Sequence, residues 1–448
     1  MSYKFESWPF KQLSFIKLIK SGFMNKLKFL SFILISILLF THCNNKINVT
    51  DGVTPLNSKE TINKPYVILI SLDGYRWDYT KRFNPPNISK LIAEGAQAES
   101  IIPCFPSKTF PNHYSIATGM YPNNHGLLDN SYFNLNKNAT YKTKDREIVE
   151  DGSWYGGTPI WVHAAQSGMV TASFFFVGSE ADIKGIRPTY YFKYDGSIKN
   201  EDRVQQALDW LTMPDGERPH LITMYFSDMD DIGHRVGPNN DDRLREAILE
   251  LDEDLGILFN GVKNTGLPVN IIIVSDHGML EIPTDQYIAL ESIENDEHYL
   301  AVSNGAIVHI YPKNENDIEK IFLELKSKEN HFTVYKTEDT PQFEINPTNK
   351  NWGGILVVPD KGWYFTSQRN IGFKKTKNIE FSGEHGFDPE FKELQGIFYA
   401  NGPSIKNGIE IPSVKNIHVY PLICEILGLK IPKEIDGKLE VLESILDK

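Results

Sequence analysis

The sequence predicts an α/β fold in which helices flank a doubly wound, mainly parallel β-sheet. Two features of the chain point to this class. The first is a set of short, continuously apolar runs, which strands buried on both faces require. The second is a helical pattern between these runs, because strands and helices that alternate along a chain build parallel sheets. With 41% hydrophobic and 23% charged residues, the 448-residue chain has the composition of a globular protein and not of a disordered one.

The apolar runs and the helical segments alternate over most of the chain. Strands are expected at 66–71, 169–176, 221–226, 270–275 and 395–400. Helices are expected at 88–94, 160–166, 202–211, 242–259 and 316–326. A stretch from about 338 to 380 has no clear period, so we expect a loop-rich insertion there. No internal repeat is visible, and we expect a single domain over 65–440.

The first 42 residues have the layout of an export signal. Lys26 and Lys28 precede a 12-residue apolar run at 29–40, and polar residues follow it. The run is shorter than the roughly 20 residues that a membrane-spanning helix needs. Met24 is a possible true start, because the residues before it add nothing that such a signal requires. We therefore expect an exported protein.

Cys43 stands between this run and a polar linker at 43–64. Its position resembles that of the lipidated cysteine of bacterial lipoproteins, although residues 40–42 are larger than those that usually precede such a cysteine. This resemblance implies a protein of the bacterial periplasm or outer envelope, held to a membrane through Cys43. A cleaved soluble signal and an uncleaved anchor remain as alternatives.

The overall charge argues against a nucleic-acid or anionic-membrane binder. The chain has 46 basic and 58 acidic residues, a formal net charge of −12, whereas such binders need a basic surface. No stable nucleic-acid partner is expected, and any phosphate site must obtain its positive charge locally. Three cysteines are too few for a disulfide scaffold. Whether Cys104 pairs with Cys424 is left open.

Aspartate and histidine residues follow the carboxyl ends of three predicted strands. They are Asp73, Asp230, His234, Asp276 and His277. Open α/β sheets place their sites beyond these strand ends, so the side chains should meet in one crevice. Crowded carboxylates repel one another unless cations lie among them. Histidine nitrogen and carboxylate oxygen together suit Zn²⁺, and His385, in a later Gly-Glu-His-Gly turn, could serve a second ion.

Thr109 opens a helical pattern and is a candidate for a catalytic hydroxyl. A hydroxyl at a helix N-terminus lies among free N–H groups, which favour bound phosphate. Threonine is also a good N-cap, and capping alone would explain the residue at this position. Taken without its context, Thr109 is better explained as a cap.

The context changes this interpretation, because six motifs occur in one order along the chain. They are Asp-Gly at 73–74, Lys-Thr-Phe-Pro-Asn-His at 108–113, Gly-Leu-Leu-Asp-Asn at 126–130, Asp230 with His234, Ser-Asp-His-Gly-Met at 275–279 and Gly-Glu-His-Gly at 383–386. Together they resemble the nucleotide pyrophosphatase/phosphodiesterase family (type I phosphodiesterases) of the alkaline phosphatase superfamily. The resemblance runs from about Pro65 to Leu429 and is to compact bacterial members. It implies an alkaline-phosphatase-like fold with loop insertions over the site.

The resemblance also implies two zinc ions and names their ligands. One site is formed by Asp73, Thr109, Asp276 and His277. The other is formed by Asp230, His234 and His385. Paired ions of this kind clamp the attacking and leaving oxygens of an in-line displacement at phosphorus.

The remaining family positions concern catalysis and substrate. The resemblance implies that Thr109 is a covalent nucleophile. It implies that Asn130 holds a phosphoryl oxygen together with the backbone N–H of Phe110. It further implies that Phe110 and Tyr194 stack on the two faces of a nucleotide base, although Tyr194 could instead pack at the rim of the site. Such stacking tolerates any base.

The function implied is zinc-dependent hydrolysis of phosphodiesters or pyrophosphates, on nucleotides or related small molecules, through a phosphothreonine. Two alternatives remain: a phosphonate hydrolase of the phosphonoacetate type, and a surface protein that binds ligands on a retained zinc fold. A sulfatase is rejected on register. In sulfatases a Thr-Gly pair follows the modified cysteine by nine positions, but here Thr118 follows Thr109, and not Cys104, by that distance.

Overall fold

The computed structural model describes residues 48–49, 56–340 and 343–447. The predicted export signal, the possible start at Met24 and the candidate lipidation site Cys43 lie outside these ranges. Within them, no helix combines enough length with enough hydropathy to cross a bilayer. The described residues belong to one compact unit.

The linker predicted at 43–64 ends earlier than expected. β1 (Asn48–Val49) pairs antiparallel with β8 (Tyr190–Phe192) at one edge of a sheet. Asn57 is buried, and its Nδ2 donates to the carbonyls of Asp215 at 2.9 Å and Arg218 at 2.7 Å. The polar composition that is typical of a linker therefore serves here to satisfy backbone groups of the folded body.

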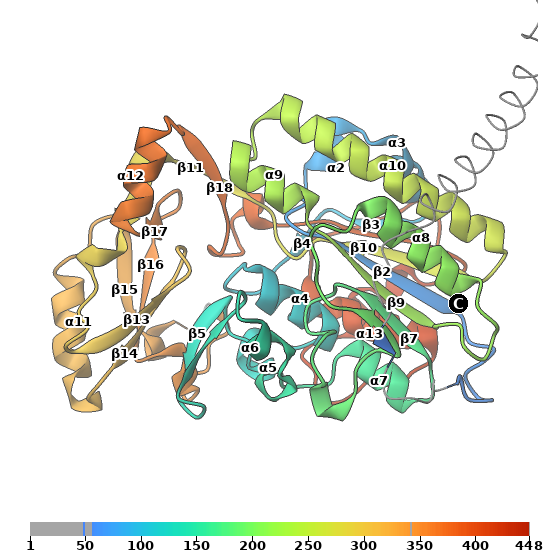
Figure 1. Ribbon diagram of the computed structural model, residues 1–448, viewed down its shortest axis with the longest axis horizontal. Coiled ribbons are helices and arrows are strands. Elements are labelled where there is room, and N and C mark those ends of the chain that lie inside the picture. Colours follow the sequence, from blue (N-terminus) through green and yellow to red (C-terminus); the bar gives the residue numbers. More distant parts are fainter. Residues whose placement is uncertain (1–47, 50–55, 341–342, 448) are drawn as a thin grey trace, which may run out of the picture. The chain divides into compact units, whose positions relative to one another are not determined.

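The centre of the fold is a nine-stranded sheet (Figure 1). Its order is β1, β8, β7 (Thr171–Phe174), β9 (Leu221–Phe226), β2 (Tyr66–Leu72), β10 (Val269–Val274), β19 (Phe398–Asn401), β3 (Ala96–Ala98) and β20 (Ile409–Ile411). The five strands from β8 to β10 run parallel, which confirms the doubly wound, mainly parallel sheet. β19 is antiparallel to β10, a direction that its apolar sequence does not reveal.

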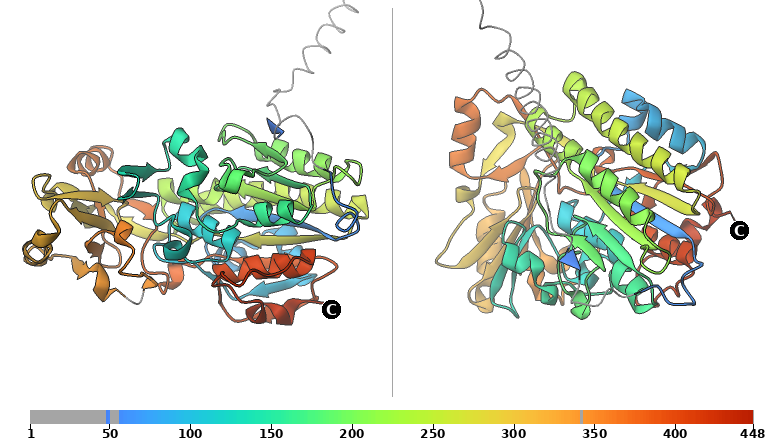
Figure 2. Two further views of the ribbon diagram at one scale, coloured as in Figure 1. Left: turned by 90° about the horizontal axis from the view of Figure 1, so that it is seen from below. Right: turned by 45° about the vertical axis from the view of Figure 1, so that its right-hand side comes forward.

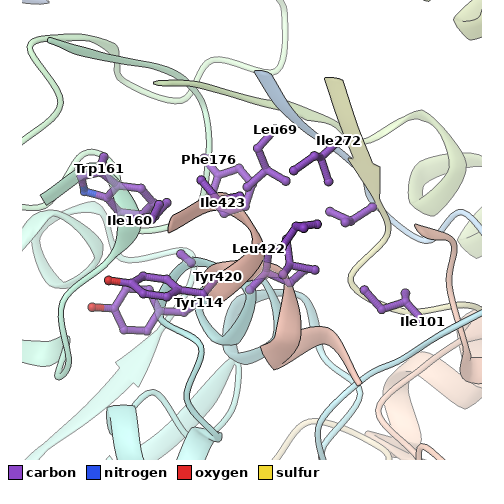
Figure 3. Packing of buried hydrophobic residues seen from close by; sticks show 14 of the residues in the cluster. Leu69, Ile101, Tyr114, Ile160, Trp161, Phe176, Ile272, Tyr420, Leu422 and Ile423 are labelled. Carbon is purple, nitrogen blue, oxygen red and sulfur yellow. The ribbon is translucent and has the colours of Figure 1, made fainter. Parts of the chain in front are cut away.

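Helices cover both faces of this sheet, as a doubly wound fold requires (Figure 2). One layer consists of α3 (Pro86–Ala93), α8 (Asn200–Leu211) and α10 (Asp241–Thr265), which contact one another. The other consists of α4 (Thr109–Thr118), α7 (Ile160–Gln166) and α13 (Val419–Leu427). Figure 3 shows the apolar layer under this second set, where Leu69 and Ile272 of the sheet lie over Leu422 and Ile423 of α13.

A second, smaller body, here called the accessory lobe, comprises residues 284–380. It interrupts a hairpin formed by β11 (Leu280–Pro283) and β18 (Phe381–Glu384). Its antiparallel sheet has the order β13 (Tyr299–Ser303), β14 (Val308–Pro312), β16 (Ile355–Pro359) and β15 (Phe332–Lys336). α11 (Ile318–Lys326) packs on this sheet and closes a separate core.

The loop-rich insertion predicted at about 338–380 is wrong for much of its length. The segment contains β16, β17 (Tyr364–Thr366) and α12 (Gln368–Thr376). β16 is a central strand that pairs with β14 and β15, and β17 pairs with β12 (Tyr287–Ala289). Strands of three to five residues are too short to show a period, and they form because partners distant in the sequence pair with them.

Candidate active site

The carboxyl ends of β9, β2 and β10, which are neighbours in the sheet, bring three aspartates together. Asp73 directly follows β2, Asp276 follows β10 by two residues, and Asp230 lies in the first turn of α9 (Asp228–Val236), after β9. Gly74 adopts φ +67°, and a Cβ on it would lie 2.9 Å from the Asp230 Cα. Only glycine permits the β2 turn and α9 to approach this closely.

Three histidines surround these carboxylates. His277 Nε2 lies 3.1 Å from Asp276 Oδ2 and 3.4 Å from Asp73 Oδ1. His234 is four residues after Asp230, hence on the same face of α9, and its Nε2 lies 3.3 Å from Asp230 Oδ1. His385, which follows β18, places its Nε2 3.6 Å from the same oxygen. The strand-end aspartates and the histidines therefore meet in one crevice.

The histidine rings are oriented by the backbone. The Nδ1 atoms of His234, His277 and His385 lie 2.7, 2.9 and 2.9 Å from the carbonyl oxygens of Gly383, Gly278 and Ser107. Because a carbonyl oxygen can only accept, each Nδ1 carries the proton and donates it. In the neutral rings of His277 and His385, Nε2 then presents a lone pair toward the carboxylates, which is the arrangement that histidine ligands of metals adopt.

The geometry fits divalent cations. Asp73 Oδ1, Asp230 Oδ1 and Asp276 Oδ2 are buried and have no hydrogen-bond partner among the described residues. Leaving a buried oxygen unpaired is costly unless a ligand satisfies it. Two groups have ligand atoms that all lie within 4.8 Å of one another: Asp73, Asp276 and His277, and Asp230, His277 and His385. His277 belongs to both groups, and His234 stands beside the second.

The electrostatics of the crevice favour a cation as well. Burial, followed by the charges of Asp276 and Asp230, raises the pKa of Asp73 well above its ordinary value. Burial lowers the pKa of His277 to about 3 and that of His385 well below its usual range, so both rings are neutral at pH 7. Burial also acts on His234, but the neighbouring Asp230 outweighs it and raises the pKa to about 9. Cations placed among these carboxylates would relieve their repulsion.

Thr109 lies at the edge of the crevice as the first residue of α4. Its Oγ1 is 3.2 Å from His277 Nε2. The N-cap position of α4 belongs to Lys108, and the side chain of that residue makes no capping hydrogen bond. The capping explanation of Thr109 is therefore wrong, and its hydroxyl faces the candidate metal ligands instead.

Asn130 and Phe110, the expected phosphate-binding pair, are in direct contact. The backbone N–H of Phe110 donates to Asn130 Oδ1 at 2.9 Å. The Nδ2 group of Asn130 has no hydrogen bond to any described residue and is a free donor. An amide N–H and a carboxamide in contact at a helix N-terminus suit the oxygens of a phosphoryl group.

A cavity of about 200 Å³ adjoins Thr109. Phe110 and Tyr194 both line it, as the stacking prediction requires, together with the aromatic side chains of Phe175, Phe176 and Tyr225. Tyr194 is 43% exposed and meets Phe175 and Tyr225 edge to face, at ring-centre distances of 5.2 and 6.2 Å. The cavity has the size and lining of a slot for one planar group.

Sequence reasoning missed two residues of the site. Tyr225, the second-last residue of β9, donates its Oη to Asp73 Oδ2 at 2.6 Å and so fixes that carboxylate. Lys108 is buried and donates its Nζ to Tyr364 Oη of the accessory lobe at 3.0 Å. Burial lowers the pKa of Lys108. The only sequence signal for Tyr225 is its position at the end of a buried strand, and no sequence pattern near Lys108 indicates its contact with Tyr364.

Cys104 and Cys424 are both buried and free.

The chain is similar in sequence to known phosphodiesterases. Residues 67–388 match the family model described as type I phosphodiesterase/nucleotide pyrophosphatase. The chain is 36% identical over 385 residues to venom phosphodiesterase CdcPDE of Crotalus durissus collilineatus, covering 83% of this chain and 45% of that protein. It is 30% identical over 365 residues to ectonucleotide pyrophosphatase/phosphodiesterase family member 5 of Homo sapiens, covering 81% of this chain and 74% of the human protein. The chain thus spans less than half the length of the venom relative.

A solved structure shows the same architecture. Murine ectonucleotide pyrophosphatase/phosphodiesterase 5, an inactive form in complex with AMP, superposes with a TM-score of 0.78 at 28% identity. The match covers 86% of this chain and 100% of the murine chain.

Proposed function

Because the chain belongs to the type I phosphodiesterase/nucleotide pyrophosphatase family, as its motifs predict, we propose that it hydrolyses phosphodiester or pyrophosphate bonds in nucleotides or related small molecules. The observation that carries this proposal is the convergence of two sets of buried ligands beside Thr109 Oγ1, with three carboxylate oxygens unpaired. The AMP bound by the murine relative supports a nucleotide substrate.

Zn²⁺ is the cation that we propose, because the donor set mixes imidazole nitrogen with carboxylate oxygen. One ion would be held by Asp73, Thr109, Asp276 and His277. The other would be held by Asp230, His234 and His385. Bound there, zinc would supply Lewis acidity and lower the pKa of a coordinated hydroxyl or water.

Thr109 is the proposed nucleophile. Its hydroxyl gives its proton to solvent as Oγ1 forms a bond to phosphorus, the bond from phosphorus to the leaving oxygen breaks, and the leaving oxygen takes up a proton from solvent. Water then attacks the phosphothreonine, releases the phosphate monoester and restores the Thr109 hydroxyl. Two in-line displacements at one phosphorus need the nucleophile and the leaving oxygen on opposite sides, which two ligand sets flanking one hydroxyl allow.

Asn130 and Phe110 would hold the phosphoryl group during both steps. The Asn130 carboxamide would donate through its free Nδ2 to a non-bridging oxygen, and the Phe110 N–H would exchange its present hydrogen bond to Asn130 Oδ1 for one to the same phosphoryl group. A base attached to the substrate would enter the slot between Phe110 and Tyr194. Tyr225 is a positioning residue, because it acts through Asp73.

Hydrolysis assays with purified, zinc-supplemented protein lacking residues 1–42 test the proposal. The nitrophenyl ester of a nucleoside monophosphate should be cleaved, and a chelator should stop the reaction. Cleavage of phosphonoacetate in preference to diesters would favour the phosphonate hydrolase instead. Nucleotide binding without turnover of any of these compounds would favour the binding protein.

The location of the protein is a separate proposal that rests on the sequence alone. We propose that residues 1–42 direct export and that Cys43 carries a lipid which holds the catalytic domain to a membrane of the bacterial envelope. Cells fed an alkyne fatty acid should label the wild-type protein, and C43A should not be labelled. Equal labelling of the two proteins would remove Cys43 from this role.

A further inference from the structure

The slot beside Thr109 carries an ion pair as well as aromatic rings. Arg146 and Glu180 line the same cavity as Phe110 and Tyr194. Arg146 Nη2 donates to Glu180 Oε2, and it lies 3.3 Å from Glu150 Oε1. Charged groups are not needed for stacking, because every base has a face that an aromatic ring can cover. The ion pair therefore has another use in a cavity of about 200 Å³.

The two partners are not equally available to a ligand. The Glu180 side chain is 7% exposed, whereas that of Arg146 is 42% exposed. A guanidinium carries five N–H donors, and both carboxylates bind the same nitrogen, Nη2. Among the described residues, nothing accepts a hydrogen bond from Nε or Nη1 of Arg146. The Nε and Nη1 groups of Arg146 are therefore the donors that a ligand in the slot can reach, whereas the Glu180 carboxylate is buried.

The guanidinium is held in place before any ligand arrives. Glu150, four residues later in the same helix, and Glu180, in the turn after β7, bind it, and Glu150 is itself bound by Lys193 Nζ at 2.5 Å. Arg146 is the first residue of α6 (Arg146–Glu150), whose N-cap Asp145 accepts from Ile148 N. An anchored guanidinium loses little conformational freedom when it binds a planar acceptor pair.

We propose that Arg146 reads the nucleobase and makes this slot prefer guanine to adenine. Guanine presents the acceptor O6 where adenine presents an amino group, and a free Nε or Nη1 donor of Arg146 can bind O6. Adenine presents N7 beside an amino donor, which would face the donors of Arg146. The discrimination expected of one such pair is about fivefold to a hundredfold. The inference rests on the proposed nucleotide substrate and adds the class of base.

Binding of nucleoside monophosphates tests the inference without any turnover. By titration calorimetry, GMP should bind the zinc-loaded wild-type protein at least about fivefold more tightly than AMP. R146M should bring the affinities for GMP and AMP within twofold of each other. R146K keeps the positive charge but not the guanidinium, and its preference should lie between those of R146M and the wild type. Equal affinities in the wild type, or an unchanged preference in R146M, would overturn the proposal.

Removal of Arg146 leaves Glu180 buried and unpaired, so R146M could fail to fold. The double variant R146M/E180Q removes both charges and should lose the preference in the same way. R187M is the matched control. Arg187 donates its Nε to the Glu180 backbone carbonyl at 2.8 Å but does not line the cavity. A preference lost in R187M to the same extent would show a general effect of the loop and would overturn the role of Arg146.

Kinetics separate this inference from the proposed function. R146M should lower kcat/KM for the nitrophenyl ester of GMP at least fivefold relative to that for the nitrophenyl ester of AMP. If the wild-type protein hydrolyses none of these compounds, the proposed function fails, and the ratio of GMP to AMP binding still decides the role of Arg146.

Discussion

The central sheet and the accessory lobe contribute to the site in different ways. Every residue of β2, β9 and β10 is buried, and the three strands deliver aspartates directly from their ends. The strands of the accessory lobe are shorter and partly exposed. None of the proposed ligands lies in the lobe, and the nearest ones in the sequence are at 276–277 before it and at 385 after it. The ends of the central strands and the helix after β9 thus carry five of the seven proposed cation ligands, whereas the lobe acts through contacts.

Those contacts converge on the phosphate-binding groups. His309 of β14 lies 3.0 Å from Asp129, with both side chains fully buried, and the other oxygen of Asp129 accepts from the Asn130 N–H at 2.7 Å. Asn304 Nδ2 donates to Ser131 O at 2.9 Å. The comparison teaches that cation binding and phosphoryl positioning are built by separate parts of the chain, so variants should be able to damage one and spare the other.

Replacement of the nucleophile should have the largest effect. T109A should lower kcat/KM by at least about 10⁴-fold, because it removes the attacking oxygen, as nucleophile removal does in covalent hydrolases. The zinc content should stay at two ions per chain, since six other ligands remain. Metal analysis and a diester assay check the two statements. T118A, on the same helix but bonded to the Tyr114 carbonyl, is the control and should remain active.

A T109A protein that keeps a few per cent of the activity would argue against a covalent route. In that case the crevice would bind the metal ions, and water would be the nucleophile.

Loss of Asn130 should damage phosphoryl positioning alone. N130A should lower kcat by about 10²–10³-fold, the cost of one oxyanion donor, with the zinc content unchanged. Single-turnover assays with a saturating diester measure this step. N136A, at an exposed position of the hairpin formed by β5 (Ser131–Asn134) and β6 (Ala139–Lys142), is the control. A change below threefold in N130A would remove Asn130 from the phosphate site.

The same contrast explains what the sequence can predict. Continuous apolar runs fix β2, β9 and β10 within one residue, and the aspartates that end them follow from the rule on parallel sheets. His385 follows none of these runs and is suggested only by its residue type in a Gly-Glu-His-Gly turn, whereas the role of Asn130 comes only from the family resemblance. The local pattern thus identifies most of the candidate ligands, and the ordered motifs assign their roles.

The parts of the site that the sequence does not predict depend on contacts between residues that are far apart in the chain. Asp129 and His309 are 180 positions apart, and neither has a pattern that indicates the other. Lys108 and Tyr364 are 256 positions apart. The lobe strands that carry these partners, β14 and β17, have five and three residues, so no window of sequence shows their period. Which of these distant residues contact each other can therefore be read only from the three-dimensional structure.

Tyr225 tests the sheet half of the comparison through a residue that touches no cation in the proposal. Y225F removes the hydrogen bond to Asp73 and should weaken zinc affinity about 10–100-fold, the usual cost of losing a partner of a metal ligand. Competition with a chromogenic chelator measures it. At saturating zinc, kcat should recover to within about threefold. Y190F, on β8 and bonded to the Glu217 carbonyl, should bind zinc as the wild type does. Unchanged affinity in Y225F would make the Tyr225 contact merely structural.

His309 tests the lobe half, where the effect should be smallest and most specific. Its Nδ1 lies 3.0 Å from Trp352 O and its Nε2 3.0 Å from Asp129 Oδ2. Asparagine can reproduce the Nδ1 contact and glutamine the Nε2 contact. H309N should therefore lower kcat about tenfold, because Asp129 no longer holds the Asn130 backbone firmly, and H309Q should restore most of the rate. Zinc affinity should match the wild type in both. Equal losses in the two variants, or a loss of zinc, would mean that the lobe supports the whole site and that the division between sheet and lobe is false.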